Sequence, residues 1–447
     1  MKTKMNPTAI LLLALPLMGL SSGAAADQAA APPSPALTLE EAITEARTHS
    51  PTVRKAQAAA DENSWRKTEV LGQGFMPKLT ATANHYFNSK YEVLDVNVGA
   101  GAVAIPLIYP ETTVGFGVQV PLFDGLANVE HLKAASLLER AAQEDLEHAE
   151  FQLDQDTKLA FYQALAAQQL EDVAEENVRT LEDHLKETDA LKKGGAATNY
   201  DVLRVQVQLT EARSDAADAH DNAAIARRKL TLVLGLEQDS RKLEGALPVP
   251  EASKVDGAQF EQVPAARTDL AALAARSDAL DKEHTAASLW LVPKISAGAE
   301  YDLYNDLTSS ISSTDQFRSA YSVGIFLQWN LFDGGVSIAR ANEAAAQREQ
   351  ADRTSEEAKL AVPYDFDLWK RKYVTSTSRY EAKRLDVERS KESVRLAKLE
   401  QRAGSRTSTE VLDAELDLYR ARAGVVNSQM SAAEALIKLE TTLGRRI

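Results

Sequence analysis

The sequence predicts a mostly α-helical protein whose few strands contribute to a transmembrane β-barrel. Three observations support this fold class. Long stretches are rich in Ala, Glu and Leu, which is typical of long helices. Short sequence words recur 209 residues further along the chain, which indicates an internal repeat. Four short segments alternate apolar and polar residues with the period of two that is typical of strands.

The composition excludes several classes of protein. The 447 residues include no cysteine, which excludes a disulfide scaffold, a thiol enzyme, an iron–sulfur protein and a lipoprotein anchored through Cys. Lys and Arg number 50 against 65 Asp and Glu, so the formal net charge is -15. This acidic balance argues against a nucleic-acid partner, because nucleic acids are bound through Lys and Arg that neutralise phosphates.

Residues 1–26 are predicted to be a cleaved signal peptide. Lys2 and Lys4 precede an apolar run over residues 9–20, and small residues follow up to Ala26. The alternative is an N-terminal membrane anchor, but the run is shorter than the roughly 20 residues that span a bilayer. We therefore expect the mature chain to be exported.

The mature chain is predicted to be one unit present twice. The word Leu122-Phe123-Asp124-Gly125 recurs as Leu331-Phe332-Asp333-Gly334, and the offset of 209 then holds without a gap as far as Gly235 and Gly444. A constant register is typical of long helices, because one inserted residue would rotate every later side chain by about 100°. We expect the first repeat at 27–244, a linker at 245–251 and the second repeat at 252–447.

Each repeat is expected to contain a helix, two strands, a very long helix and a shorter returning helix. Residues 126–193 include no Gly or Pro, so they can form one helix of about 100 Å at about 1.5 Å per residue. Gly195 suits the turn that follows, and the return helix is expected from about Asn199 to Leu234. The second repeat has Pro363 where the first has Asp154. A proline inside a helix bends or breaks it, so we expect a local bend near Pro363 in the second repeat only.

The four alternating segments lie near residues 79–84, 114–120, 295–304 and 321–331. In an exported protein this pattern is typical of barrel strands with an apolar face toward lipid and a polar face toward the lumen. The alternative is an ordinary sheet half-buried under the helices. Four strands cannot close a barrel alone, since the smallest have about eight, and an open sheet would leave edge amides unsatisfied in lipid. Several chains would therefore share one barrel; three would supply twelve strands and two would supply eight.

The chain resembles the outer-membrane efflux protein family, the TolC-like exit ducts, over essentially its whole mature length. The resemblance rests on the two Leu-Phe-Asp-Gly words, on the Pro-Lys pairs at Pro77 and Pro293, and on two hairpin motifs at 194–203 and 403–413. It implies a homotrimer with a 12-stranded barrel in outer-membrane lipid and an α-helical tunnel across the periplasm. It also implies a passive duct of a tripartite efflux or type I secretion system, on which a periplasmic adaptor (membrane fusion) protein and an inner-membrane pump dock.

The hairpin motifs are expected to form a gate at the periplasmic tip. Glu410 and Asp413 are three residues apart and share one helix face, so threefold symmetry would arrange them as two rings of carboxylates. Arg406 would pair with Asp201 of a neighbouring hairpin, and Tyr200 would be a further gate residue. The alternative is that these are ordinary residues of a helix start, where acids complement the helix dipole.

Gly195 and Gly404 are expected to form the hairpin turns that an adaptor contacts. No catalytic residue, cofactor or metal site is predicted, because the sequence has no nucleophile elbow, P-loop or His-Glu-x-x-His motif. The seven histidines are expected at exposed helix positions; they are His49, His85, His131, His148, His184, His220 and His284.

The competing hypothesis is a non-channel coiled-coil protein, such as a periplasmic adaptor or a structural protein. An adaptor would have one helical hairpin between lipoyl-like and barrel β domains. The sequence instead predicts two hairpins and two short pairs of strands, which favours the duct.

Overall fold

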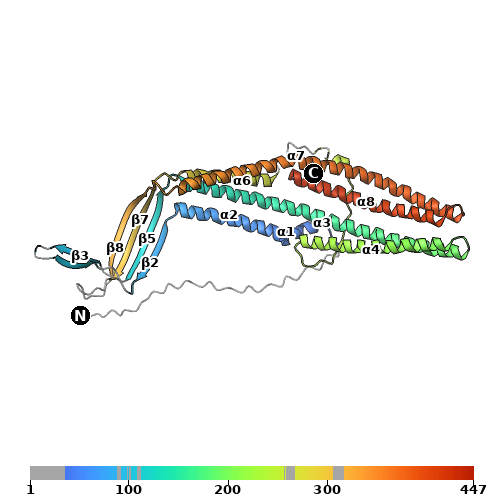
Figure 1. The fold of residues 1–447 in the computed structure, drawn as a ribbon, viewed down its shortest axis with the longest axis horizontal. Coiled ribbons are helices and arrows are strands. Elements are labelled where there is room, and N and C mark those ends of the chain that lie inside the picture. Colours follow the sequence, from blue (N-terminus) through green and yellow to red (C-terminus); the bar gives the residue numbers. More distant parts are fainter. Residues whose placement is uncertain are drawn as a thin grey trace.

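The computed structural model describes residues 36–87, 92–97, 99, 102–107, 112–255, 257, 267–305 and 317–447. The predicted signal peptide lies outside these residues. The described chain is an elongated helical bundle with a four-stranded sheet at one end and two helical hairpins at the other (Figure 1). The predicted fold class, mostly helical with a few strands, is confirmed.

The helices are α1 (Leu39–His49), α2 (Pro51–Phe75), α3 (Ala127–Lys193), α4 (Asn199–Val233), α6 (Thr268–Ser288), α7 (Val336–Arg402) and α8 (Ser408–Leu443), with a short 3-10 helix η1 (Ala252–Val255). The strands are β1 (Ala36–Leu37), β2 (Lys78–His85), β3 (Glu92–Asn97), β4 (Ala102–Leu107), β5 (Thr112–Phe123), β6 (Lys242–Leu243), β7 (Lys294–Asn305) and β8 (Phe317–Gln328). The helices α3 and α7 each have 67 residues, or about 100 Å, and start 209 residues apart. The return helices α4 and α8 also start 209 residues apart, so the predicted repeat register is confirmed.

The Leu-Phe-Asp-Gly words recur because their aspartates cap the two long helices. The backbone N–H of Asn128 donates to Asp124 Oδ2 at 2.7 Å, and the backbone N–H of Ser337 donates to Asp333 Oδ2 at 3.0 Å. Each carboxylate thus satisfies an amide that has no partner within the first helical turn. The repeated word is a start signal for a helix.

The helix α7 is continuous through Pro363. The proline therefore removes one backbone hydrogen bond without ending the helix, and the local bend expected in the second repeat stays a prediction. The equivalent residue of α3, Asp154, is buried.

The sheet joins the two repeats, because its strand order is β2-β5-β7-β8 and every neighbouring pair is antiparallel. One row across it reads Ala81, Phe116, Tyr301 and Tyr321, and the adjacent row reads Thr80, Gly117, Glu300 and Ser322. One face is thus mainly apolar and the other mainly polar, as the alternation predicts.

The helices do not cover this sheet. The strands β2 and β8 are exposed along almost their whole length, and the sheet extends beyond the ends of the helices (Figure 1). The alternative of a sheet half-buried under the helices is therefore wrong. Within the part of the chain that the structure describes, the outer edges of β2 and β8 have no strand partner.

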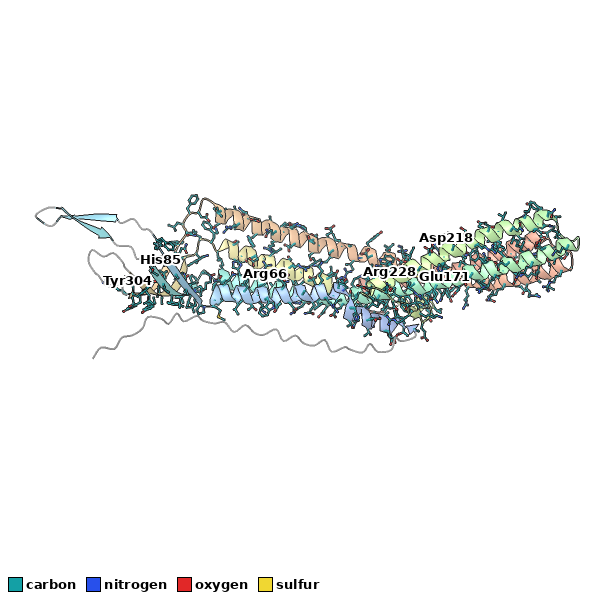
Figure 2. The ribbon with its side chains drawn as sticks, turned by 90° about the horizontal axis from the view of Figure 1, so that it is seen from below. Arg66, His85, Glu171, Asp218, Arg228 and Tyr304 are labelled. Carbon is teal, nitrogen blue, oxygen red and sulfur yellow. The ribbon has the colours of Figure 1, made fainter. Side chains whose placement is uncertain are left out.

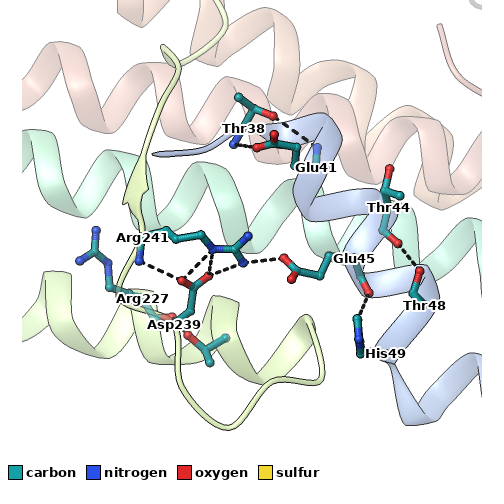
Figure 3. Close-up of polar contacts among 10 residues, drawn as sticks. Thr38, Glu41, Thr44, Glu45, Thr48, His49, Arg227, Asp239 and Arg241 are labelled. Carbon is teal, nitrogen blue, oxygen red and sulfur yellow. Dashed lines mark hydrogen bonds and ion pairs between the residues drawn. The ribbon is translucent and has the colours of Figure 1, made fainter. Parts of the chain in front are cut away.

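Two further strand pairs were not predicted. The strands β3 and β4, which lie between β2 and β5 in the sequence, form an antiparallel pair of their own. The two-residue strands β1 and β6 form a parallel pair. Beside the second pair, Arg241 bridges Asp239 at 2.8 Å and Glu45 of α1 at 2.5 Å (Figure 3). The hydrogen bonds that the Arg241 guanidinium donates to Asp239 and Glu45 raise the pKa of Arg241. This bridge fixes α1 to the segment that follows α4.

The core is thin because it lies between pairs of helices rather than inside a globule. A central cluster includes Phe161, Leu165 and Leu234, and a smaller cluster nearer the hairpin tips is formed by Leu181, Leu209, Ala212 and Leu412. Alanine is frequent in the buried surface, which lets the helices approach closely. Among the described residues, no helix has the length and apolar content that a membrane span requires.

Candidate functional site

The two hairpin tips lie at the far end of the bundle from the sheet, whose position His85 and Tyr304 mark in Figure 2. At the first tip, Gly195 has a φ of 78°, which a glycine adopts without strain. Thr198 then begins α4 as a capping box with Asp201: the Thr198 N–H donates to Asp201 Oδ2 at 2.8 Å, and the Asp201 N–H donates to Thr198 Oγ1 at 3.2 Å. Tyr200 between them is 67% exposed.

The second tip repeats this geometry 209 residues later. Gly404 has a φ of 74°, and Thr407 forms a capping box with Glu410. The Thr407 N–H donates to Glu410 Oε2 at 2.9 Å. Arg406 forms an ion pair with Glu400 of its own hairpin at 2.9 Å.

Both capping carboxylates are held in their charged form. Hydrogen bonds from Thr198 lower the pKa of Asp201, and hydrogen bonds from Thr407 lower the pKa of Glu410. Each acid thus stabilises the start of its helix, as the alternative interpretation of the sequence proposes.

The tips are joined across the hairpins by a pair that the sequence did not indicate. Arg204 of α4 lies 3.6 Å from Asp413 of α8, and their side chains are 39% and 63% exposed. The expected partners Arg406 and Asp201 are engaged within their own hairpins, with Glu400 and Thr198 respectively. Of the expected gate residues, Asp413 is therefore the one that the structure connects to the opposite hairpin of the same chain.

A buried polar cluster lies further along the hairpins. His184 of α3 contacts Glu415 and Ser408 of α8, with Nδ1 2.8 Å from Glu415 Oε2 and Nε2 2.8 Å from Ser408 Oγ. The side chains of His184 and Glu415 are only 3% and 2% exposed. The expectation of exposed helix positions is therefore wrong for His184, which is buried, and for His85, which lies on the strand β2.

A signal for this cluster was present in the sequence. His184 lies three residues after Leu181, on the stripe of α3 that packs against α8. Glu415 lies three residues after Leu412 on the matching stripe. A polar residue on an apolar stripe indicates either a buried partner or a tilt of the helix, and here the partner exists.

The acids and histidines do not assemble into a metal site. Within the described ranges, no group of three or more His, Asp or Glu residues is arranged to hold a metal ion. Charged side chains such as Glu171, Asp218 and Arg228 lie along α3 and α4 (Figure 2).

Comparison with known proteins identifies this architecture. The family model described as "Outer membrane efflux protein" matches residues 42–236 and 260–445, which is most of the chain. The chain belongs to the outer membrane efflux protein family. The outer membrane efflux protein BepC of Brucella suis is 24% identical over 354 residues, covering 74% of this chain and 72% of BepC.

Solved structures show the same fold. The CmeC outer membrane channel of Campylobacter jejuni matches with a TM-score of 0.78 and 13% identity, covering 91% of this chain and 85% of CmeC. The outer membrane protein VceC of Vibrio cholerae matches with a TM-score of 0.74 and 16% identity, covering 91% of this chain and 96% of VceC. As a member of the outer membrane efflux protein family, the chain is an outer-membrane efflux channel that extends into the periplasm, and it is not an enzyme.

Proposed function

We propose that three copies of this chain form one passive exit duct, with a 12-stranded barrel in the outer membrane and a helical tunnel below it. The observation that carries this proposal is the four-stranded sheet, which has one apolar face, one polar face and exposed outer strands. Such a strip cannot remain open in lipid, because its edge amides would lack hydrogen bonds. Three strips supply twelve strands, within the range of outer-membrane barrels.

The gate of this duct is at the hairpin tips. In a trimer the tips converge at the end of helices about 100 Å long, and Glu410 and Asp413 then form rings of carboxylates around the axis. Asp201, Tyr200 and Arg406 lie in the same tips and complete the constriction. Rings of carboxylates favour cations over anions.

An inner-membrane pump supplies the energy through a periplasmic adaptor, in a tripartite efflux or type I secretion system. The adaptor docks on the turns at Gly195 and Gly404. A Cβ atom built at either glycine meets nothing within 4 Å, so both turns are open to a partner.

The duct and its gate are tested by conductance in planar lipid bilayers. The purified, detergent-extracted protein is expected to be a trimer and to give stepwise conductance in KCl with a preference for K⁺. Asp413→Asn is expected to reduce that preference severalfold and to raise the conductance, because it also removes the contact with Arg204.

Asp183→Asn is the matched control. Asp183 is 76% exposed and pairs with Lys186 on its own helix, so its loss leaves the tips unchanged. A monomer that is soluble without detergent and gives no conductance would support the coiled-coil alternative. Equal effects of the two substitutions would place the selectivity elsewhere in the duct.

A further inference from the structure

One large apolar side chain lies on the polar face of the sheet. Near the end of β8 this face carries Ser322, Gly324, Phe326 and Gln328, of which Phe326 alone is large and apolar. Phe326 is 55% exposed. The polar face of an outer-membrane barrel lines the lumen, so in the proposed duct this aromatic ring faces the path of the cargo.

Two glycines make room for the ring. Gly298 of β7 and Gly324 of β8 lie directly opposite each other in the sheet. A Cβ atom built at Gly298 would lie 2.9 Å from Phe326 Cε2, and one built at Gly324 would lie 3.6 Å from Phe326 Cζ. The ring therefore lies over the glycine pair, where no other side chain occupies the space, and it presents an exposed aromatic surface.

A carboxylate lies beside this surface. Glu300 is two residues beyond Gly298 on the same face of β7, or about 7 Å along the strand at about 3.4 Å per residue, and it is exposed. Over the residues that the structure describes, no ion pair of the Glu300 carboxylate is recorded. Asp302 follows after two more residues, and its Oδ1 lies over Gly115 of β5, 2.6 Å from the Cβ position of that glycine.

The basic residues of the same face lie farther from the ring. Lys78 is in the row of Gly298 but two strands away, which is about 10 Å. Lys294 is four residues from Gly298 along β7, or about 14 Å, and Arg318 is six residues from Gly324 along β8, or about 20 Å. In the register of the described sheet, Glu300 is therefore the charged residue nearest to the ring.

We propose that Phe326 and Glu300 form a subsite for organic cations of the aromatic or quaternary ammonium class on the lumen face of each sheet. The proposal rests on the proposed duct, because the polar face lines a lumen only in an assembled barrel. The face of an aromatic ring attracts a cation, and an organic cation also buries apolar surface on the ring. Glu300 supplies the opposite charge. Three chains provide three such subsites near the junction of the barrel and the helices.

The alternative is that Phe326 has a structural role alone. An aromatic side chain that covers glycines on a neighbouring strand stabilises a sheet, and this role needs no ligand. A ring with only this role gives the lumen no preference for one kind of ligand over another. The ligand preference therefore distinguishes the two interpretations, whereas a stability measurement does not.

Binding is measured by saturation-transfer difference NMR on the full-length, detergent-extracted protein. Three small probes differ in one property each: benzyltrimethylammonium has a ring and a positive charge, tetramethylammonium lacks the ring, and benzenesulfonate has the ring with a negative charge. Benzyltrimethylammonium is expected to bind severalfold more tightly than either of the other two. The ring protons of this probe are expected to receive the strongest saturation, since they lie on Phe326.

Phe326→Leu and Glu300→Gln are each expected to weaken the binding of benzyltrimethylammonium about two- to fivefold, which is the range of a cation–π contact at an exposed site. Tyr321→Leu is the matched control for the ring, because Tyr321 is also an aromatic residue of β8, is 80% exposed and lies on the apolar face. Asp183→Asn is the control for the charge, since Asp183 lies on α3 outside the sheet. Asp413→Asn changes the tip and is expected to leave the binding of this probe unchanged.

Conductance of the same preparations in planar bilayers tests the duct separately. Conducting channels that bind the three probes equally, prefer benzenesulfonate or bind none of them overturn the subsite and leave the duct intact. Unchanged binding in both the Phe326→Leu and the Glu300→Gln protein also overturns it. If Phe326→Leu does not assemble, Glu300→Gln decides, because it removes only one exposed charge. A ligand preference that both variants lose, in a protein without conductance, supports the subsite and counts against the duct.

Discussion

Arg47 and Arg446 bind the same carboxylate although they lie 399 positions apart in the sequence. Arg47 Nε and Nη2 donate to Asp154 Oδ1 and Oδ2 at 2.8 and 2.6 Å, and Arg446 Nη2 donates to Oδ2 at 2.9 Å. The carboxylate is 3% exposed, whereas the two arginine side chains are 53% and 59% exposed. The contact ties α1 and the residues after α8 to the middle of α3.

Because the carboxylate is buried and the arginines are exposed, we expect that removing the arginines costs more free energy of unfolding than removing the carboxylate charge. Removing both arginines leaves a buried carboxylate without a partner and is expected to cost about 3 kcal/mol or more of unfolding free energy. Asp154→Asn leaves two arginines that water can reach and is expected to cost about 1–2 kcal/mol. Denaturant unfolding of the detergent-extracted protein measures both, and the opposite order of costs would contradict this account.

The start of α3 carries strain that the start of α7 avoids. Leu126 has a φ of 72°, and the equivalent residue of the second repeat is Gly335 with a φ of 87°. A left-handed conformation costs a side-chain-bearing residue about 1–2 kcal/mol, and Leu126 is mainly exposed, so little packing opposes its removal. Leu126→Gly is expected to raise the melting temperature and Gly335→Leu to lower it. A lower melting temperature for Leu126→Gly would show that its side chain has a contact partner in the assembled protein.

A histidine pair between α3 and α6 predicts a pH-dependent stability. His131 Nδ1 lies 2.9 Å from Glu283 Oε2, and this hydrogen bond raises the pKa of His131 above its ordinary 6.5. The stabilisation is therefore fully present below pH 6.5 and is lost as the pH rises through the raised pKa. Glu283→Gln is expected to lower the melting temperature at pH 6 and to have a progressively smaller effect at higher pH. Asp183→Asn is the control, because the lysine that it leaves unpaired stays charged over this range.

The same substitution is expected to have opposite effects at two glycines. Gly195→Ala places a side chain at a φ of 78° and should weaken the tip by about 1 kcal/mol, although the new Cβ meets nothing within 4 Å. Gly72→Ala, inside α2 with equally open space, should stabilise that helix by about 1 kcal/mol. Hydrogen exchange by mass spectrometry resolves both: amides near Gly195 should exchange about fivefold faster and amides of α2 more slowly. Equal effects at the two sites would mean that the backbone angle at Gly195 does not matter.

The sequence predicted the long helices well because two signals mark their ends: the glycines of the turns and the constant register of the repeat. Gly195 and Gly404 follow the ends of the two long helices, and the 209-residue repeat supplies each boundary twice, although α7 contains Pro363. All four strands of the sheet, β2, β5, β7 and β8, were found by alternation. The pair β1–β6 has only two residues per strand, which is too short for any periodicity to appear.

The candidate site was predicted less well because its contacts are between distant residues. The capping boxes Thr198–Asp201 and Thr407–Glu410 are local, and their sequence signature is two residues three positions apart. The contacts of Asp413 with Arg204 and of His184 with Glu415 depend on how α8 packs against the first hairpin. Packing geometry of this kind cannot be obtained from the pattern of a single helix.

The pairing of β5 with β7 has a consequence for biogenesis. Gln119 and Ser296 meet across these strands although they lie 177 positions apart, and all of α3, α4 and α6 is made in between. During export, β5 can therefore pair with β2 as soon as it emerges, but its other neighbour, β7, is not yet made. Its apolar residues face water until β7 follows. Long-range strand pairing is slow and leaves aggregation-prone edges. The helices can form as they emerge, so the sheet is the part of the fold that is completed last. A periplasmic chaperone that shields β2 and β5 in this interval would protect the nascent channel.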